Sequence, residues 1–195
     1  MEQTKAALLV IDMQNGFLEA QSPLWIAQAK ATVPCCARVI RQARQHRLPV
    51  IFITRAYRAD GSDVELARKA RWEAGGKPLS PDAQGPLSAA MPAEFEVQAT
   101  DYRIVKPRYS GFFHTELDLI LRRLGVRRIF LTGTTTPNCI RTTCYDGLSL
   151  DYDVVIVEDC CSSQNDAIQK ANMLDMANAG AQEISSAEFE KFLEQ

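Results

Sequence analysis

Short apolar, β-branched runs alternate with amphipathic stretches of helical length along most of the chain. This alternation is typical of α/β proteins, in which helices connect the strands of a mainly parallel sheet. We therefore predict a three-layer, doubly wound α/β fold with a central six-stranded sheet and helices on both faces, because such crossovers are right-handed. The expected strands are residues 6–12, 49–54, 103–106, 128–132, 154–158 and 182–184. The expected helices are residues 33–46, 115–124, 137–150, 165–179 and 187–193.

Residues 56–100 depart from this pattern. They are rich in Gly, Pro, Asp and Arg, and only 64–72 has a short helical pattern. A long irregular stretch inside a compact domain is usually a lid, a binding loop or an interface arm. We expect substrate selection, subunit contact or both from this segment. The sequence has no internal repeat, and 195 residues suit one domain of ordinary size, so residues 1–195 are predicted to form a single domain.

Charge and hydropathy argue against two classes of partner. The net charge of −2 gives no electrostatic basis for binding nucleic acid or an anionic membrane. No apolar run approaches the ~20 residues of a membrane span, and the first residues lack the pattern of a signal peptide. We therefore expect a cytoplasmic protein that acts on a small molecule.

The cysteine and histidine positions do not indicate a metal site. Four of the six cysteines form the adjacent pairs 35–36 and 160–161, which match neither the CxxC redox spacing nor the spacing of zinc ligands. Most of these thiols are expected in the core. His46 is expected at an exposed helix end, and His114 either caps a helix or lines a pocket. No metal and no other cofactor is predicted.

Three segments that are far apart in sequence each place one reactive side chain at a predicted strand end. These side chains are Asp12, Lys106 and Cys139. Taken singly, each has an ordinary structural role, as a strand-end cap, a solvated charge and a small buried hydrophobe. In an open α/β sheet, however, the carboxyl ends of the strands form the ligand crevice. We therefore expect the three side chains to converge in one reactive site.

This set of groups suits acyl transfer. Cys139 lies near an expected helix start, where unpaired N–H groups and the helix dipole favour a thiolate. Asp12 can accept the thiol proton and deliver it to a leaving amine, and Lys106 would stabilise both negative charges. The backbone N–H groups of Thr135 and Cys139 are candidate donors to a tetrahedral oxyanion.

Three motifs resemble those of the isochorismatase-like cysteine hydrolases. They are LVIDMQNGF at residues 9–17, KPRYSGFF at 106–113 and GTTTPNCIRTTCYD at 133–146, and the likeness extends over almost the whole chain. The resemblance implies that Cys139 is the nucleophile, Asp12 the general acid and base, and Lys106 the cationic third member. It also implies a cis peptide bond between Thr134 and Thr135, which would orient the oxyanion donors. It further implies a homo-oligomer, either a dimer or a tetramer.

Within this family, the sequence favours cleavage of a C–N bond. The amide-cleaving branch requires the cysteine, whereas isochorismatases proper cleave a vinyl ether and can work without it. Nicotinamidases add a metal site with histidines after the second strand, and residues 54–63 contain none. The run at 106–118 is closest to the ureido and carbamoyl amidohydrolases. Two alternatives stay open, a vinyl-ether hydrolase and a non-catalytic or redox-sensing member of the fold.

Further residues are candidates for the wall of the substrate pocket. We expect Gln14 to share the side of Asp12 if strand geometry persists, and Arg58 either to pair with a substrate carboxylate or to lie in solvent. Trp72 would serve as a lid residue or an interface anchor. Aromatic residues near strand ends either line the pocket or pack beneath it. The predicted substrate-binding residues are Gln14, Phe17, Tyr57, Arg58, Trp72, Phe112, Phe113 and Tyr145.

Overall fold

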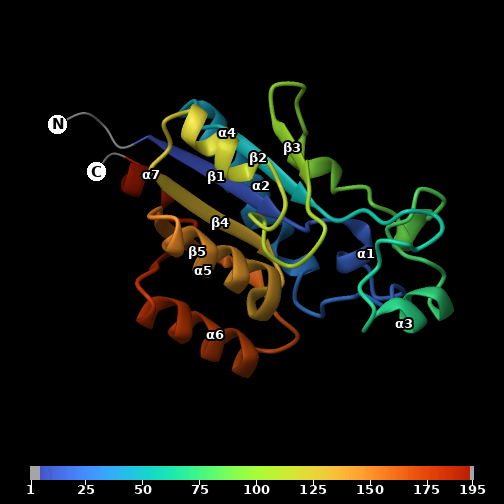
Figure 1. The fold of residues 1–195 in the computed structure, drawn as a ribbon. Helices are drawn as coiled ribbons and strands as arrows, with labels where there is room; N and C mark the ends of the chain where they lie inside the picture. The colour runs from blue at the N-terminus through green and yellow to red at the C-terminus, as the bar shows by residue number, and fades with distance from the viewer. Residues whose placement is uncertain (1–4, 194–195) are drawn as a thin grey trace.

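A wholly parallel, six-stranded sheet forms the centre of the computed structural model, which describes residues 5–193 (Figure 1). Its strand order is β3-β2-β1-β4-β5-β6. The strands are β1 (Ala6–Ile11), β2 (Val50–Thr54), β3 (Tyr102–Val105), β4 (Arg128–Thr134), β5 (Asp153–Ser162) and β6 (Gln182–Ile184). The predicted α/β fold and all six strands are confirmed, and the sheet is wholly rather than mainly parallel.

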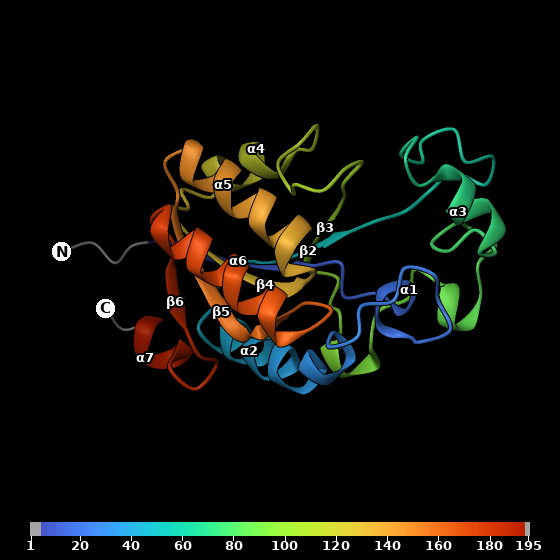
Figure 2. The same cartoon turned by 90° about the horizontal axis from the view of Figure 1, so that it is seen from below.

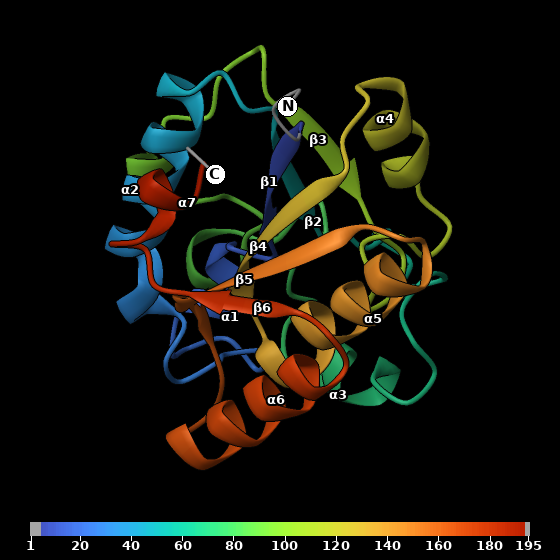
Figure 3. The ribbon, with the colours of Figure 1, turned by 90° about the vertical axis from the view of Figure 1, so that its left-hand side faces the viewer.

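Helices cover both faces of the sheet. In the described part of the chain these are α1 (Asn15–Leu18), α2 (Val33–Gln45), α3 (Lys69–Ala74), α4 (Leu117–Arg123), α5 (Arg141–Ser149), α6 (Asp166–Asn178) and α7 (Phe189–Leu193). Three 3₁₀ turns (Lys30–Thr32, Gly85–Leu87 and Ala93–Phe95) and a π-helical turn (Thr136–Ile140) complete the connections. Helices α4, α5 and α6 lie on one face, and α2 and α7 lie on the other (Figures 2 and 3).

The strands are apolar on both faces because both faces are covered. In β1, Leu9 and Ile11 pack in the core beneath α4, α5 and α6, while Leu8 and Val10 pack beneath α2 and α7. A parallel strand that is buried on both faces has a continuous apolar sequence rather than an alternating one. The run from Ala6 to Ile11 has this character.

The chain reverses its direction of winding between β1 and β4. It proceeds outward from β1 through β2 to β3, and then returns to place β4 on the other side of β1. Such a switch point opens a crevice at the carboxyl ends of the strands, where open α/β sheets bind ligands. The ends of β1 and β4 approach so closely at Gly133 that no side chain fits there. A Cβ atom at this position would lie only 2.0 Å from the Ile11 carbonyl oxygen.

Much of the irregular segment lies beyond this edge of the sheet. Helix α3, close to the predicted 64–72, sits with α1 past the carboxyl ends of the strands (Figure 1). A small apolar cluster holds this region together, and it comprises Phe17, Tyr57, Val64, Trp72 and Leu79. The indole Nε1 of Trp72 donates to the Pro78 carbonyl at 2.8 Å. The segment therefore forms a packed wall above the strand ends. Among the described helices, none is long and apolar enough to cross a membrane.

Candidate active site

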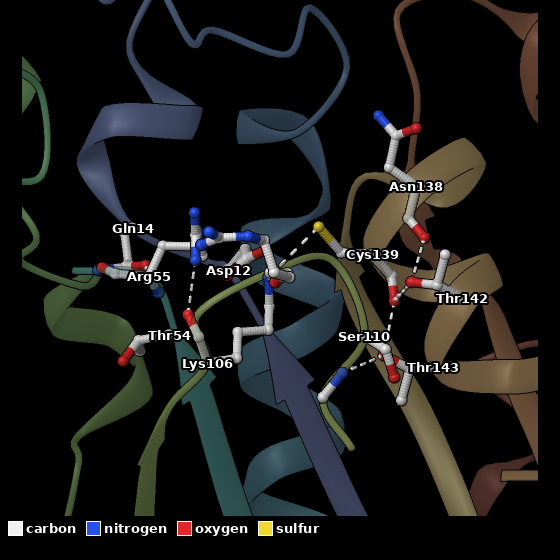
Figure 4. Close-up of polar contacts among 12 residues, drawn as sticks. Asp12, Gln14, Thr54, Arg55, Lys106, Ser110, Asn138, Cys139, Thr142 and Thr143 are labelled. Carbon is white, nitrogen blue, oxygen red and sulfur yellow. Dashed lines mark hydrogen bonds and ion pairs between the residues drawn. The ribbon is translucent and has the colours of Figure 1, made fainter. Parts of the chain in front are cut away.

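Asp12, Lys106 and Cys139 meet at the switch point, although they come from β1, β3 and the turn after β4 (Figure 4). The Lys106 Nζ atom lies 2.6 Å from Asp12 Oδ2 and donates to Cys139 Sγ at 3.4 Å. Asp12 and Lys106 are 1% and 0% exposed, and Cys139 is 8% exposed. The ammonium group thus bridges a carboxylate and a thiol in a nearly dry environment.

The thiol of Cys139 is protonated at neutral pH. Burial and, after it, the Asp12 carboxylate raise its pKa to about 12, because Lys106 only partly opposes them. Burial also acts to lower the pKa of Lys106, but the charges of Asp12 and Cys139 outweigh it and raise that pKa. The sequence indicated that the helix terminus and Lys106 favour a thiolate, but burial and the Asp12 carboxylate outweigh the effect of Lys106.

Asp12 acts on both of its neighbours in the site. Its carboxylate lies 2.6 Å from Lys106 Nζ, and it raises the pKa of Lys106 and of Cys139. The backbone at Asp12 has φ 54°, a left-handed conformation that is uncommon for a residue other than glycine. This conformation ends the strand geometry of β1 at the site.

Hydroxyl groups fasten the turn between β4 and Cys139. The peptide bond between Thr134 and Thr135 is cis, at the predicted position. Thr135 Oγ1 and Thr136 Oγ1 both donate to the Ser162 carbonyl at 3.1 Å, and Ser162 Oγ donates to Thr134 Oγ1 at 3.0 Å. The end of β5 therefore fixes the turn that carries the nucleophile candidate.

Thr143 of α5 connects the Cys139 turn to the chain that follows Lys106 (Figure 4). Its hydroxyl donates to the Cys139 carbonyl at 2.6 Å and accepts from the Gly111 N–H at 2.8 Å. The two segments that contribute Lys106 and Cys139 are thus held to each other as well as to the sheet.

A cavity of about 160 Å³ opens above the three side chains. This volume is below the range of drug-sized pockets and suits a small substrate. The lining residues are Asp12, Phe17, Pro23, Leu24, Trp25, Ile26, Arg55, Glu65, Arg68, Arg71, Trp72, Lys106, Arg108, Tyr109, Thr135, Asn138, Cys139 and Gln164. Of the predicted pocket residues, the structure places Phe17 and Trp72 in this lining. The other six do not line it.

Gln14 and Tyr57 lie behind the cavity wall. The left-handed turn at Asp12 breaks the strand alternation, so Gln14 does not follow the direction of Asp12. Its side-chain amide instead donates to the Arg55 carbonyl at 2.9 Å and accepts from the Arg55 N–H at 2.8 Å. The Tyr57 hydroxyl donates to Glu65 at 2.9 Å. Both side chains support Arg55 and Glu65, which do line the cavity.

The other four predicted pocket residues face elsewhere. The side chain of Arg58 is 70% exposed, so it takes the second of its two expected positions, in solvent. Phe112 stacks on Tyr152 at 5.7 Å between ring centroids and packs against the core. Phe113 is 47% exposed, and Tyr145 packs against the core on the α5 side. Aromatic packing beneath the site accounts for Phe112 and Tyr145 better than pocket lining does.

Sequence reasoning missed a set of charged residues in the cavity wall. They are Arg55, Glu65, Arg68, Arg71 and Arg108. Arg55 donates to the Lys106 carbonyl at 2.7 Å and to Glu65 at 2.5 Å, so it ties β3 to the irregular segment. The available signal was the density of arginines at 55–71, but the sequence did not indicate which of them face inward.

The described residues do not present a metal site. Among residues 5–193, no group of three or more His, Cys, Asp and Glu side chains is placed to hold a metal ion. Neither His46 nor His114 lines the cavity. The titratable groups that line the cavity include the Cys139 thiol, the Asp12 carboxylate and the cationic side chains.

Comparison with known proteins identifies the family. The isochorismatase domain family matches residues 6–188. The chain belongs to the isochorismatase family. It is 38% identical over 176 residues to a probable inactive nicotinamidase of Arabidopsis thaliana, with 89% of each chain covered. It is also 34% identical over 185 residues to the ureidoacrylate amidohydrolase RutB of Yersinia enterocolitica, covering 85% of this chain and 79% of that protein.

A solved structure supports the same assignment. An isochorismatase family protein from Desulfovibrio vulgaris superposes with a TM-score of 0.92 at 36% identity, over 98% of this chain and 100% of the other. The chain thus has the fold of a family of hydrolases. At the switch point of this fold, the Lys106 ammonium contacts the Asp12 carboxylate and the Cys139 thiol.

Proposed function

We propose that the chain is a cysteine hydrolase that needs no metal and cleaves the C–N bond of a small amide, ureide or carbamoyl compound. The observation that carries this proposal is the contact of Cys139, Asp12 and Lys106 at the base of a small cavity. A thiol, a carboxylate that can serve as a base and a fixed ammonium are groups that suit acyl transfer. The likeness to an amidohydrolase supports the choice of bond.

In the first half-reaction, Cys139 Sγ attacks the substrate carbonyl carbon while its proton passes to Asp12. Because the thiol is protonated at rest, proton transfer accompanies the attack rather than preceding it. The backbone N–H groups of Thr135 and Cys139 would stabilise the oxyanion. Protonated Asp12 then gives its proton to the departing nitrogen, which leaves as ammonia or an amine. The product at this stage is a thioester on Cys139.

In the second half-reaction, Asp12 takes a proton from water, and the hydroxide attacks the thioester carbonyl. Collapse of this intermediate expels the sulfur, which recovers its proton from Asp12. Lys106 remains charged throughout and stabilises the negative charge as it moves between Asp12 and the sulfur. The net reaction adds one water across one C–N bond.

Ammonia release by the purified protein and its Cys139→Ala variant tests this function. The panel would contain ureidoacrylate, N-carbamoylglycine, biuret, maleamate and nicotinamide. Isochorismate, which contains no nitrogen, would be followed separately by its disappearance. We expect turnover of a C–N substrate that falls to background in Cys139→Ala, because the covalent step is lost. Cys35→Ser is the matched control, since Cys35 is a half-buried thiol outside the cavity, and its rate should stay within about twofold.

A second readout detects the intermediate itself. Rapid acid quenching during turnover should yield an acyl adduct on the peptide that contains Cys139, and mass spectrometry would locate it. Unchanged ammonia release in Cys139→Ala would contradict the mechanism. Cleavage of isochorismate that survives this substitution would instead favour vinyl-ether hydrolysis.

A further inference from the structure

The cavity carries a strong excess of positive charge. Among its described lining residues, five are basic and two are acidic, so its formal charge is +3 while the whole chain carries −2. Charge of one sign in a cleft raises the local concentration of ligands of the opposite sign. The excess of positive charge is therefore a property of the cavity and not of the whole protein surface, and it favours an anionic ligand.

The two acidic groups are already paired. Asp12 lies against Lys106, and Glu65 accepts hydrogen bonds from Arg55 at 2.5 Å and from the Tyr57 hydroxyl at 2.9 Å. These pairs account for two of the five cations. The remaining three are Arg68, Arg71 and Arg108, which we call the arginine cluster.

Arg68 is the member with an open guanidinium. Its Cζ atom lies 4.9 Å from the centroid of the Tyr109 ring, and within residues 5–193 its guanidinium makes no hydrogen bond or ion pair. Stacking on an aromatic ring orients the planar group while leaving its N–H donors free for another partner. Arg68 and Cys139 both line the cavity.

The other two members are oriented by neutral acceptors. Arg71 donates to the Pro23 carbonyl at 2.5 Å, and Arg108 donates to the Asp63 carbonyl at 3.1 Å. Backbone carbonyls fix the direction of a guanidinium without neutralising its charge. All three positive charges of the arginine cluster are thus available to an anion in the cavity.

We propose that the arginine cluster, with Arg68 as its main donor, binds a carboxylate of the substrate. This inference rests on the proposed function and narrows its substrate class to anionic ureides, carbamoyl compounds or amides. The planar fork of arginine matches a carboxylate and gives paired, charge-assisted hydrogen bonds. Because the cavity is small, the carboxylate lies only a few bonds from the scissile carbonyl.

The first test compares substrates that differ only in charge. Ammonia release would be measured from ureidoacrylate and N-carbamoylglycine and from the methyl ester of each. We expect the wild-type protein to prefer the acids. Arg68→Gln should raise KM for the acids about 10- to 100-fold, the range for loss of a hydrogen bond to a charged group, with kcat changed much less. KM for the esters should stay nearly constant, and Arg68→Lys should restore part of the preference.

Arg58→Gln is the matched control, because it removes an arginine of the same segment whose side chain is 70% exposed and outside the cavity. It should leave the ratio between acid and ester unchanged. Equal hydrolysis of acid and ester by the wild type, or equal effects of Arg68→Gln on both, would overturn the inference.

The second test needs no turnover and separates this inference from the proposed function. Iodoacetate and iodoacetamide alkylate thiols and differ by one negative charge. Peptide mass spectrometry would measure the alkylation of Cys139 by each reagent. The iodoacetate rate divided by the iodoacetamide rate should fall about tenfold in Arg68→Gln and stay constant in Arg58→Gln. If the protein hydrolyses nothing but shows this fall, the anion site stands and the proposed reaction fails. A ratio that is independent of Arg68 would overturn the anion site whether or not turnover occurs.

Discussion

At the scale of single residues, the site is arranged around a thiol that is kept protonated. Burial and the Asp12 carboxylate together raise the pKa of Cys139 to about 12, in spite of the neighbouring ammonium. A preformed thiolate would react with many electrophiles, whereas a thiol beside a base becomes nucleophilic only when a carbonyl is in place. This arrangement favours selectivity over general reactivity.

The proposed role of Asp12 as the base predicts opposite effects on two reactions of the same sulfur. Asp12→Asn removes the negative charge that raises the pKa of Cys139, so the thiolate population at pH 8 should increase. Alkylation of Cys139 by iodoacetamide should accelerate, by about tenfold for each unit that the pKa falls. Hydrolysis should be lost, because the base is absent. Slower alkylation in Asp12→Asn would contradict the assigned electrostatics.

At the scale of elements, the close approach of β1 and β4 defines the site. Gly133 pairs with Ile11 and has φ +113°, and an added Cβ would lie 2.0 Å from the Ile11 carbonyl oxygen. Asp12 and the cis peptide both follow this point directly, so any separation of the strands would move the carboxylate away from the Cys139 turn.

We therefore predict that Gly133→Ala lowers the free energy of unfolding by about 3 kcal/mol or more, combining backbone strain with steric overlap. Gly180→Ala is a matched control, since Gly180 has the same φ of +113° but no atom within 4 Å of an added Cβ. It should cost only about 1 kcal/mol, the strain of the conformation alone. Urea unfolding would measure both. Equal losses would show that the contact with β1 contributes nothing.

The sequence predicted element positions well where apolar runs were continuous, and less well where charge interrupted them. The predicted strand 154–158 ends at charged residues, yet β5 continues to Ser162. It does so because Cys161 and Ser162 pair with Gly133 and Thr134 at the end of β4, beyond a register shift. Glu158 and Asp159 are exposed within this strand, and local sequence alone could not reveal that the pairing resumes after them.

At the scale of the whole molecule, the floor of the site was predictable and its walls were not. Asp12 and Lys106 each follow a strand directly and Cys139 lies in the turn after β4, so the sheet topology determines their convergence. The walls depend on how residues 56–100 fold back over the strand ends. Arg58 and Arg68 belong to the same irregular segment, yet the side chain of Arg58 is 70% exposed whereas Arg68 lines the cavity.

The distribution of thiols has a consequence for the stability of the whole protein. The pKa values of Cys139 and Cys144 are raised to about 12, with burial as the largest cause, and burial also acts to raise the pKa of Cys161. In the unfolded chain these thiols regain ordinary pKa values near 8.5. Above that pH the unfolded state has released protons that the folded state still holds, so the free energy of unfolding falls as pH rises.

We therefore predict a steady loss of stability between pH 9 and pH 10.5, in a window below the raised pKa values of these thiols. Each such thiol contributes a slope of up to about 1.4 kcal/mol per pH unit.

Cys144 offers the clearest test, because burial is the single cause of its pKa shift and its side chain lies outside the cavity. Urea unfolding under reducing conditions should give a shallower pH slope for Cys144→Ala than for the wild type, whatever its stability at pH 7. If stability stayed constant through this window, the described thiols would have to ionise as readily in the folded protein as in the unfolded chain, and the protonated resting state of Cys139 would fail with them.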